Sequence, residues 1–167
     1  MVDVADSSYV LEAAQARFIG GPVSISVACA DANLVPSVAR AFGCRLSTDR
    51  RQVTVFLSAT RAATLLRDLG AGGAVAAVFS RPSTHQTLQL KGRVVAVGAL
   101  APGDRERMSA YGEQFSTEIL ALGYPEKFAH ALVMPVSDDA VAVCFAVAAA
   151  FEQTPGPAAG RRLPTQP

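Results

Sequence analysis

Short turns between successive strand-like segments are the feature that most restricts how this chain can fold. Apolar residues alternate with small or polar ones along the first such segment, at Val23, Ile25, Val27 and Cys29. A turn at residues 31–33 follows directly. Turns this short can join antiparallel strands, whereas a crossover between parallel strands needs about a dozen residues or more. The chain is therefore predicted to form an antiparallel sheet.

Further strands are expected along the rest of the chain. They span residues 34–46, 53–57, 74–80, 87–100 and 140–151. Gly43 is a candidate break in the first of these, and Gly92 is a candidate bulge or point of close approach in the long one. The last strand is hydrophobic on both faces and needs cover on each side, from the barrel interior and from a partner subunit.

Three helices are predicted between these strands. Ser8 can cap the first, which ends at Gly20-Gly21, and the second runs from Thr60 to Leu69 before Gly70. The third lies between Pro102 and Gly123, with an apolar stripe at Met108, Tyr111, Phe115, Ile119 and Leu122. The order of elements indicates a mainly β (α+β) chain, an antiparallel barrel with helices packed outside.

The length of 167 residues is suited to one domain with one core. We expect that domain to cover residues 1–154, with an N-terminal helix over 1–21 and the barrel core over 22–154. The tail over residues 155–167 is rich in Pro, Gly and Arg. It is expected to be extended or disordered.

The chain has more apolar material than a small monomer needs, since 50% of its residues are hydrophobic and 17% are charged. This surplus predicts the buried interface of a homodimer. Membrane residence is the alternative, but no uninterrupted apolar stretch reaches the roughly 20 residues that span a bilayer. Met1–Ser8 also lacks the basic region of a signal peptide. We expect a soluble, cytoplasmic protein.

The charges and cysteines exclude several classes of function. A net charge of +1 gives no diffuse positive surface to attract nucleic acid. Cys29, Cys44 and Cys144 have no CxxC spacing and stand in apolar runs, which favours buried free thiols over a disulfide or metal site. The sequence shows no paired carboxylates, no Ser-His-Asp set and only two histidines. Most acid–base machineries are therefore excluded.

Three stretches resemble the pyridoxamine 5'-phosphate oxidase-like family of FMN-binding split barrels. Residues 27–40 are similar to the family's pattern of strand, Asp-rich turn, Pro and a strand carrying a basic residue. Residues 79–92 resemble the segment that runs under the flavin and ends in a strand with Gly. Residues 151–157 are similar to the C-terminal signature of a subgroup of relatives rather than of the oxidase itself.

The resemblance implies a split β-barrel that works as a homodimer, with FMN in a cleft between the subunits. It implies a flavin-dependent oxidoreductase acting on a small-molecule substrate. A flavin enzyme needs few catalytic side chains, because the cofactor supplies the redox chemistry. The chain has the run Gln153–Pro157 where the oxidase has an Arg-rich stretch that grips the substrate phosphate. Oxidation of pyridoxine phosphate is therefore not expected.

Three alternatives to FMN-dependent turnover stay open. The protein could bind flavin without catalysis, bind or degrade haem, or use a deazaflavin cofactor. Haem requires a positioned histidine, and a deazaflavin requires room and basic groups for a longer phosphate-bearing tail.

The FMN phosphate carries close to two negative charges and needs cationic or backbone donors. Arg40, Arg61 and Lys91 are the candidates. Arg40 and Lys91 stand inside otherwise uncharged strands, and we expect both to face the cleft and neutralise the phosphate; a solvated outer face is the alternative. Arg61 opens a helix, where its charge opposes the dipole unless an anion is present. A plain surface position is its alternative.

Donors to the pyrimidine edge of the flavin are expected among hydroxyl and amide side chains. The candidates are Ser58, Thr84, Gln86 and Thr87, although a polar run of this kind is also typical of a loop. His85 could contact flavin, or iron in a haem-handling relative, and a surface loop position is the alternative. His130 stands near a helix end, where capping is the simpler interpretation.

Overall fold

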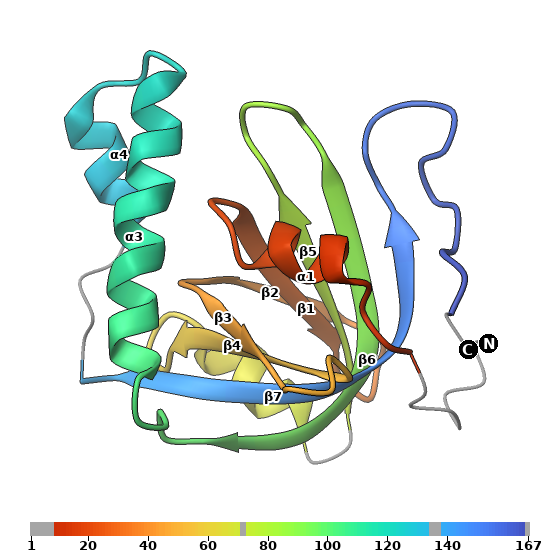
Figure 1. Cartoon of the computed structure of the whole chain (residues 1–167). Helices are drawn as coiled ribbons and strands as arrows, with labels where there is room; N and C mark the ends of the chain where they lie inside the picture. The colour runs from red at the N-terminus through yellow and green to blue at the C-terminus, as the bar shows by residue number, and fades with distance from the viewer. Residues whose placement is uncertain (1–8, 71–72, 134–137, 166–167) are drawn as a thin grey trace.

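The computed structural model describes residues 9–70, 73–133 and 138–165 of the chain (Figure 1). Its helices are α1 (Ala13–Ile19), α2 (Ala63–Leu69), α3 (Asp104–Ala121) and α4 (Glu126–Leu132). Its strands are β1 (Ser24–Ala30), β2 (Pro36–Ala41), β3 (Cys44–Leu46), β4 (Gln52–Ser58), β5 (Ala74–Ser80), β6 (Thr87–Gly98) and β7 (Ala140–Glu152). No helix in these ranges is long and apolar enough to cross a membrane.

All seven strands form one antiparallel sheet in the order β2-β1-β5-β6-β7-β4-β3. The sheet curls on itself, and the long strands β6 and β7 curve around its lower end (Figure 1). Its two ends meet where Phe42 N–H donates to the Phe56 carbonyl (2.8 Å) and Phe56 N–H donates to the Gly43 carbonyl (3.1 Å). The prediction of a mainly β split barrel with helices packed around it is therefore confirmed.

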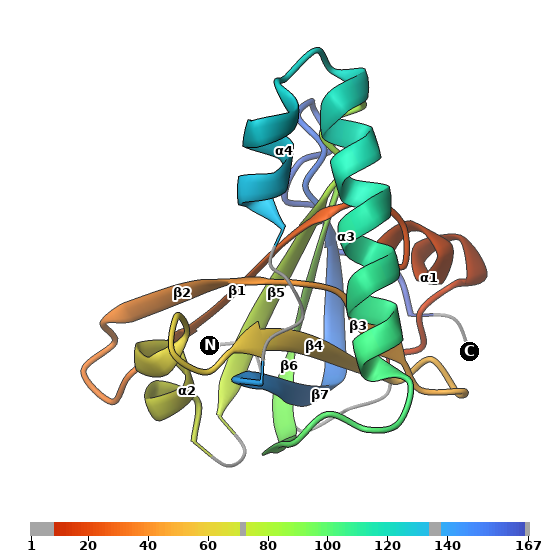
Figure 2. The same cartoon turned by 90° about the vertical axis from the view of Figure 1, so that its left-hand side faces the viewer.

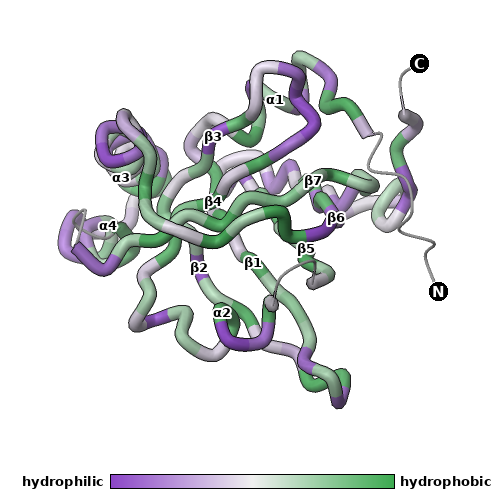
Figure 3. The backbone as a smooth tube through the Cα atoms, turned by 90° about the horizontal axis from the view of Figure 1, so that it is seen from below, coloured by the Kyte–Doolittle hydropathy of each residue, from purple (hydrophilic) through white to green (hydrophobic). Residues whose placement is uncertain are grey.

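Buried and exposed residues alternate along the strands, and this alternation determines which side chains fill the barrel interior. Every second residue points inward and is buried, and the inward set includes Ile25, Val27, Val53, Val55, Val75, Ala77, Phe79, Leu90, Val143, Phe145 and Val147. The tube in Figure 3 is mainly hydrophobic along these strands, with hydrophilic residues on the helices and turns. Helix α1 adds Phe18 and Ile19 to this core, and α2 adds Leu65 and Leu69.

Gly43 divides the predicted strand over residues 34–46 into β2 and β3. Its φ of 118° lies in the region that favours glycine. A Cβ at this position would lie 3.3 Å from the Phe56 ring and 3.4 Å from Cβ of Tyr111. The candidate break is confirmed, and it is the point at which the barrel closes.

Gly92 lies at a register shift between β6 and β7. Lys91 pairs with Ala149 and Gly92 with Val147, so Ala148 is an extra residue on β7. A Cβ on Gly92 would lie 2.0 Å from the Ala146 carbonyl oxygen. The predicted bulge and close approach are both present, and they let the two long strands bend around the barrel.

The helices differ from the expected ones in three places. Helix α2 begins at Ala63 rather than Thr60, so Arg61 lies in the turn before the helix and does not open it. Helix α1 begins at Ala13, because Glu12 N–H donates to Oε1 of Gln15 (2.9 Å) and caps it; the expected cap Ser8 lies outside the described residues. Helix α4 was not expected, since seven residues are too few to show a helical period. It runs beside α3 (Figure 2), where Gly112 leaves room for Val133, whose Cβ is 3.8 Å from a Cβ placed there.

The tail was expected to be extended or disordered, but over residues 155–165 it folds back onto β7. Gly160 N–H donates to the Glu152 carbonyl (2.7 Å), and Leu163 N–H donates to the Ala150 carbonyl (2.8 Å). Strand β4 pairs only with residues 140–146 of β7, so the far end of β7 has an edge available. The tail occupies that edge.

Candidate functional site

A hollow of about 350 Å³ lies on the outer face of the sheet. Its floor is one row of the register, in which Ala28 pairs with Ala76, Ala76 with Lys91, and Lys91 with Ala149. The lining residues come from β1, β5, β6 and β7: Ala28, Cys29, Ala30, Ala74, Val75, Ala76, Lys91, Gly92, Ala148 and Ala149. Because most of these side chains are single methyl groups, the floor is flat and apolar.

Lys91 is the charged residue among those that line the hollow. Its Nζ lies 4.8 Å from the ring centre of Phe151, a cation–π contact on the same outer face. Thr87 and Gln89 precede it at alternate positions of β6, so all three project from one face of that strand. The hollow therefore combines an apolar floor with one cation and a short row of polar side chains.

The other predicted residues of this region lie in the turn between β5 and β6. Thr84, His85 and Gln86 are exposed there, and His85 has a φ of 57°. Thr87 shares a hydrogen bond with Ser80 (Oγ1 to Oγ, 2.8 Å), and its N–H donates to Oγ1 of Thr154 (2.9 Å). The structure thus brings Thr84, His85, Gln86 and Thr87 together at the end of the strand that carries Lys91.

Ser58 and Arg61 lie at the opposite end of the barrel. Ser58 pairs with Ala140 at the start of β7, and about 30 Å of strand separates Ala140 from Ala149. The Ser58 hydroxyl donates to Oδ2 of Asp139 (2.6 Å) and accepts from Arg61 N–H (3.2 Å). Within one chain these two residues do not join Lys91. The Ser58 side chain ties β4 to β7 and to the start of α2.

Arg40 lies on β2, with its guanidinium 4.8 Å from the ring centre of Phe115 on α3. Its Nη1 donates to Oγ of Ser24 (3.0 Å). Strands β1 and β5 lie between Arg40 and Lys91, and three strand spacings place their backbones about 14 Å apart. The two cations have separate aromatic neighbours, Phe115 for Arg40 and Phe151 for Lys91. That both neutralise the flavin phosphate stays a prediction.

The groups beside Arg40 are neutral at neutral pH. Burial raises the pKa of Tyr111 to about 12, although the Arg40 charge acts in the opposite direction. The Tyr111 hydroxyl donates to the Val23 carbonyl (2.9 Å). Burial also raises the pKa of the Cys44 thiol to about 12. Neither group supplies a negative charge to the guanidinium.

Sequence reasoning missed the alanine floor, Phe151 and the Arg40–Phe115 contact. Strand alternation alone does not show that Ala28, Ala76 and Ala149 lie in one row. That conclusion also requires the pairing register of four strands, which the sequence does not give. Phe115 reaches Arg40 from a helix far along the sequence, and no local pattern signals such a contact.

No family model matches the chain, and no curated protein matches it by sequence. Several solved structures do resemble it. An F420 reductase is 14% identical over 80% of this chain and 93% of its own length, with a TM-score of 0.51. HupZ of Group A Streptococcus is 17% identical over 90% of this chain and 100% of its own, with a TM-score of 0.54. A candidate pyridoxamine 5'-phosphate oxidase of Lactobacillus delbrueckii is 15% identical over 89% of this chain and 97% of its own length, with a TM-score of 0.52.

At these identities the likeness concerns the fold. The chain has the split-barrel fold of the pyridoxamine 5'-phosphate oxidase-like proteins, as its sequence motifs predicted. The match spans nearly the whole of each solved chain, so the barrel and its helices are shared rather than one local motif.

Proposed function

We propose that the protein is a homodimeric FMN-binding oxidoreductase that acts on a small molecule at the outer face of its barrel. The observation that carries this proposal is the alanine floor with Lys91 in the same row, between Ala76 and Ala149. A planar aromatic ring system can lie flat on a floor of small side chains, whereas larger residues at Ala28, Ala76 and Ala149 would fill the space.

The residues around the hollow fit a flavin. Thr87 and Gln89 offer hydroxyl and amide groups on the strand face that carries Lys91, where they would bond the polar edge of the ring. Lys91 would neutralise negative charge on the cofactor. When bound, FMN supplies electron transfer to or from the substrate, and the protein contributes binding, orientation and exclusion of water.

An exposed apolar side chain beside the hollow supports the presence of a second subunit. Val38 continues the floor row on β2 and is 70% exposed. A second copy covering this face would bury Val38 and would close the open side of the hollow. Outward residues of β7, among them Ala146, would contribute to the interface.

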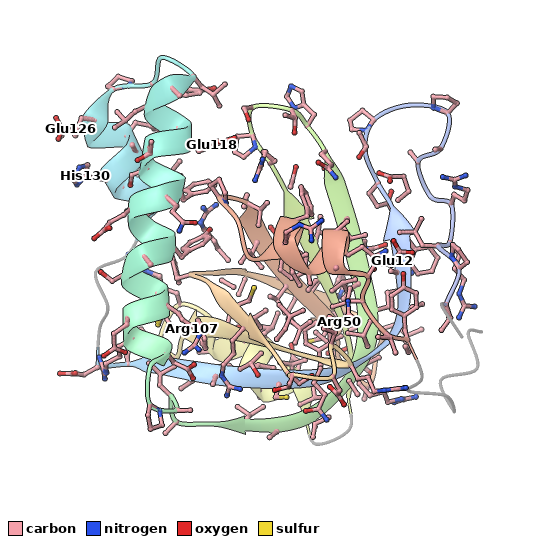
Figure 4. The ribbon with its side chains drawn as sticks, in the orientation of Figure 1. Glu12, Arg50, Arg107, Glu118, Glu126 and His130 are labelled. Atoms are coloured by element: carbon pink, nitrogen blue, oxygen red, sulfur yellow. The ribbon has the colours of Figure 1, made fainter. Side chains whose placement is uncertain are left out.

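The geometry favours flavin over haem at this position. Haem iron is held by an axial His, Cys, Met or Tyr. Among the residues that line the hollow, Cys29 is the one of these types, and its Sγ already contacts the Ser37 hydroxyl and the Leu65 carbonyl. His85 is exposed in the β5–β6 turn, and His130 pairs with Glu126 on α4 (3.6 Å), where Figure 4 shows both side chains on the outer side of the helix. Neither histidine is among the residues that line the hollow. A deazaflavin cofactor remains the second candidate, since a similarly folded protein is an F420 reductase.

The visible absorption spectrum of the purified protein is the direct test, followed by titration with FMN and quenching of flavin fluorescence. We expect one flavin per subunit. Lys91→Met keeps much of the side chain's packing and should weaken FMN binding about ten-fold or more. A protein that neither carries nor takes up FMN or a deazaflavin would contradict the proposal.

A further inference from the structure

A second cavity lies between the end of β7 and the loop of the returning tail. Its volume is about 350 Å³, and small-molecule sites have roughly 300–1,000 Å³. Glu152 and Arg161 are the two charged residues of its lining, and Gln86 reaches it from the β5–β6 turn. The rest of the lining is the loop itself: Thr154, Pro155, Gly156, Pro157 and Ala158. The cavity therefore presents one acid and one guanidinium among small and apolar residues.

Glu152 and Arg161 are neighbours across the pairing of the tail with β7. Glu152 N–H donates to the Arg161 carbonyl (2.9 Å), and Gly160 N–H donates to the Glu152 carbonyl (2.7 Å). The next residue of the tail, Arg162, forms a bridge with Phe151. Successive side chains of extended chain point to opposite faces. Arg161 therefore lies on the side of Glu152, and Arg162 lies on the side of Phe151.

The two opposite charges in the cavity do not pair directly. No ion pair joins Glu152 to Arg161 within the ranges that the structure describes. Oε1 of Glu152 instead accepts a hydrogen bond from Thr154 N–H (3.0 Å). A hydrogen bond from the Thr154 side chain is the main reason that the pKa of Glu152 lies below its ordinary value, and the Arg161 charge contributes. An ionised carboxylate and a guanidinium therefore share the cavity, and each can bind a ligand group of the opposite charge.

An apolar cavity of about 180 Å³ adjoins the charged one. Gln86 and Glu152 line both, so these two residues form the wall between them. Phe18 of α1, Leu88 of β6 and Leu163 of the tail supply its large apolar side chains. Figure 1 shows α1 in front of β6, with the end of β7 and the tail beside them. The charged cavity therefore continues into an apolar one.

Glu152 belongs to the opposite face of the sheet from the alanine hollow. It pairs with Leu88, whose side chain is buried in the barrel core. Lys91 lies three positions further along β6 and pairs with Ala149 in the outward row. Because side chains alternate along a strand, Leu88 and Lys91 point to opposite faces. A ligand beside Glu152 would therefore not compete with a flavin on the alanine floor.

We propose that the two adjoining cavities bind an α-amino acid with an apolar side chain. The ammonium group pairs with the Glu152 carboxylate, and the carboxylate accepts from the planar fork of Arg161. The side chain of the amino acid enters the apolar cavity beside Phe18, Leu88 and Leu163. A plain amine or a plain carboxylic acid would satisfy only one of the two charges. This site is separate from the proposed flavin site and does not depend on it.

Calorimetric titration of the full chain with L-leucine tests the site. The wild-type protein should bind L-leucine, and Glu152→Gln and Arg161→Gln should each lower the affinity about ten-fold or more. Glu152→Gln keeps an oxygen that can accept from Thr154 N–H, so the loop should retain its fold. Arg162→Gln is the matched control and should bind as the wild-type protein does, because Arg162 lines neither cavity.

Three analogues test the same site in the wild-type protein, without any variant that has to fold. 4-Methylpentanoate lacks the ammonium group of leucine, isoamylamine lacks the carboxylate, and glycine lacks the side chain. Each should bind at least ten-fold more weakly than L-leucine. Absence of L-leucine binding, equal binding of L-leucine and the analogues, or equal affinities in Glu152→Gln, Arg161→Gln and Arg162→Gln would overturn the proposal.

Discussion

Asp104 accepts a 2.9 Å hydrogen bond from Nε of Arg45, and its side chain is completely buried while that of Arg45 is 35% exposed. The second carboxylate oxygen accepts from Ala101 N–H (2.9 Å). One buried charge thus joins the first turn of α3 to β3, at the place where the helix is set against the barrel.

Asp104→Ala should lower the free energy of unfolding by about 2–3 kcal/mol, since it removes hydrogen bonds to a buried charged group. The half-exposed Arg45 can still reach water, which limits the loss. Urea denaturation followed by circular dichroism measures the change. Asp138→Asn is the control, because its pair with Arg105 (3.5 Å) is at the surface, and it should leave the unfolding midpoint where it is.

Gly92→Ala should destabilise the fold by about 1–3 kcal/mol or more, because the new methyl group would lie 2.0 Å from the Ala146 carbonyl oxygen and force β6 and β7 apart. Thermal unfolding of the variant provides the measurement. Gly98→Ala on the same strand has nothing within 4 Å of its Cβ. If the two variants unfold at the same temperature, the close approach at Gly92 does not constrain the barrel.

Stability should fall as the pH rises above about 9. The pKa of Cys44 is raised from 9.0 to about 12, and that of Tyr111 from 10.0 to about 12. The unfolded chain therefore loses these protons first, which draws the equilibrium toward unfolding between pH 9 and 12, whereas below pH 9 the contribution is constant. Cys44→Ala should flatten this dependence in denaturation series across that range. An unchanged slope would show that the thiol ionises freely in the folded protein.

Ala76→Arg should abolish flavin uptake and dimer formation together, because a long charged side chain would occupy the centre of the alanine floor. Fluorescence quenching and sedimentation velocity report the two effects separately. Ala121→Arg at the exposed end of α3 is the matched control and should change neither. Loss of flavin from a protein that stays dimeric would place the interface elsewhere.

Features fixed by local chemistry were predictable, and features fixed by distant contacts were not. Gly43 and Gly92 could be recognised because only glycine suits the positive φ of the one and the close carbonyl of the other. Alternation put Lys91 on the same strand face as Thr87. The role of Ser58 depends on Asp139, 81 residues away, which no local pattern reports. Helix α4 and the returning tail are too short to show a period.

The tail that returns along β7 also covers a strand edge that would otherwise be unpaired. Residues 150–152 lie beyond the reach of β4, and their main-chain groups would otherwise form the kind of open edge that templates pairing between molecules. Leu163 and Arg161 occupy it through bonds to Ala150 and Glu152. A chain ending at Thr154 would expose this edge to its neighbours, so its characteristic failure would be strand addition and aggregation rather than unfolding.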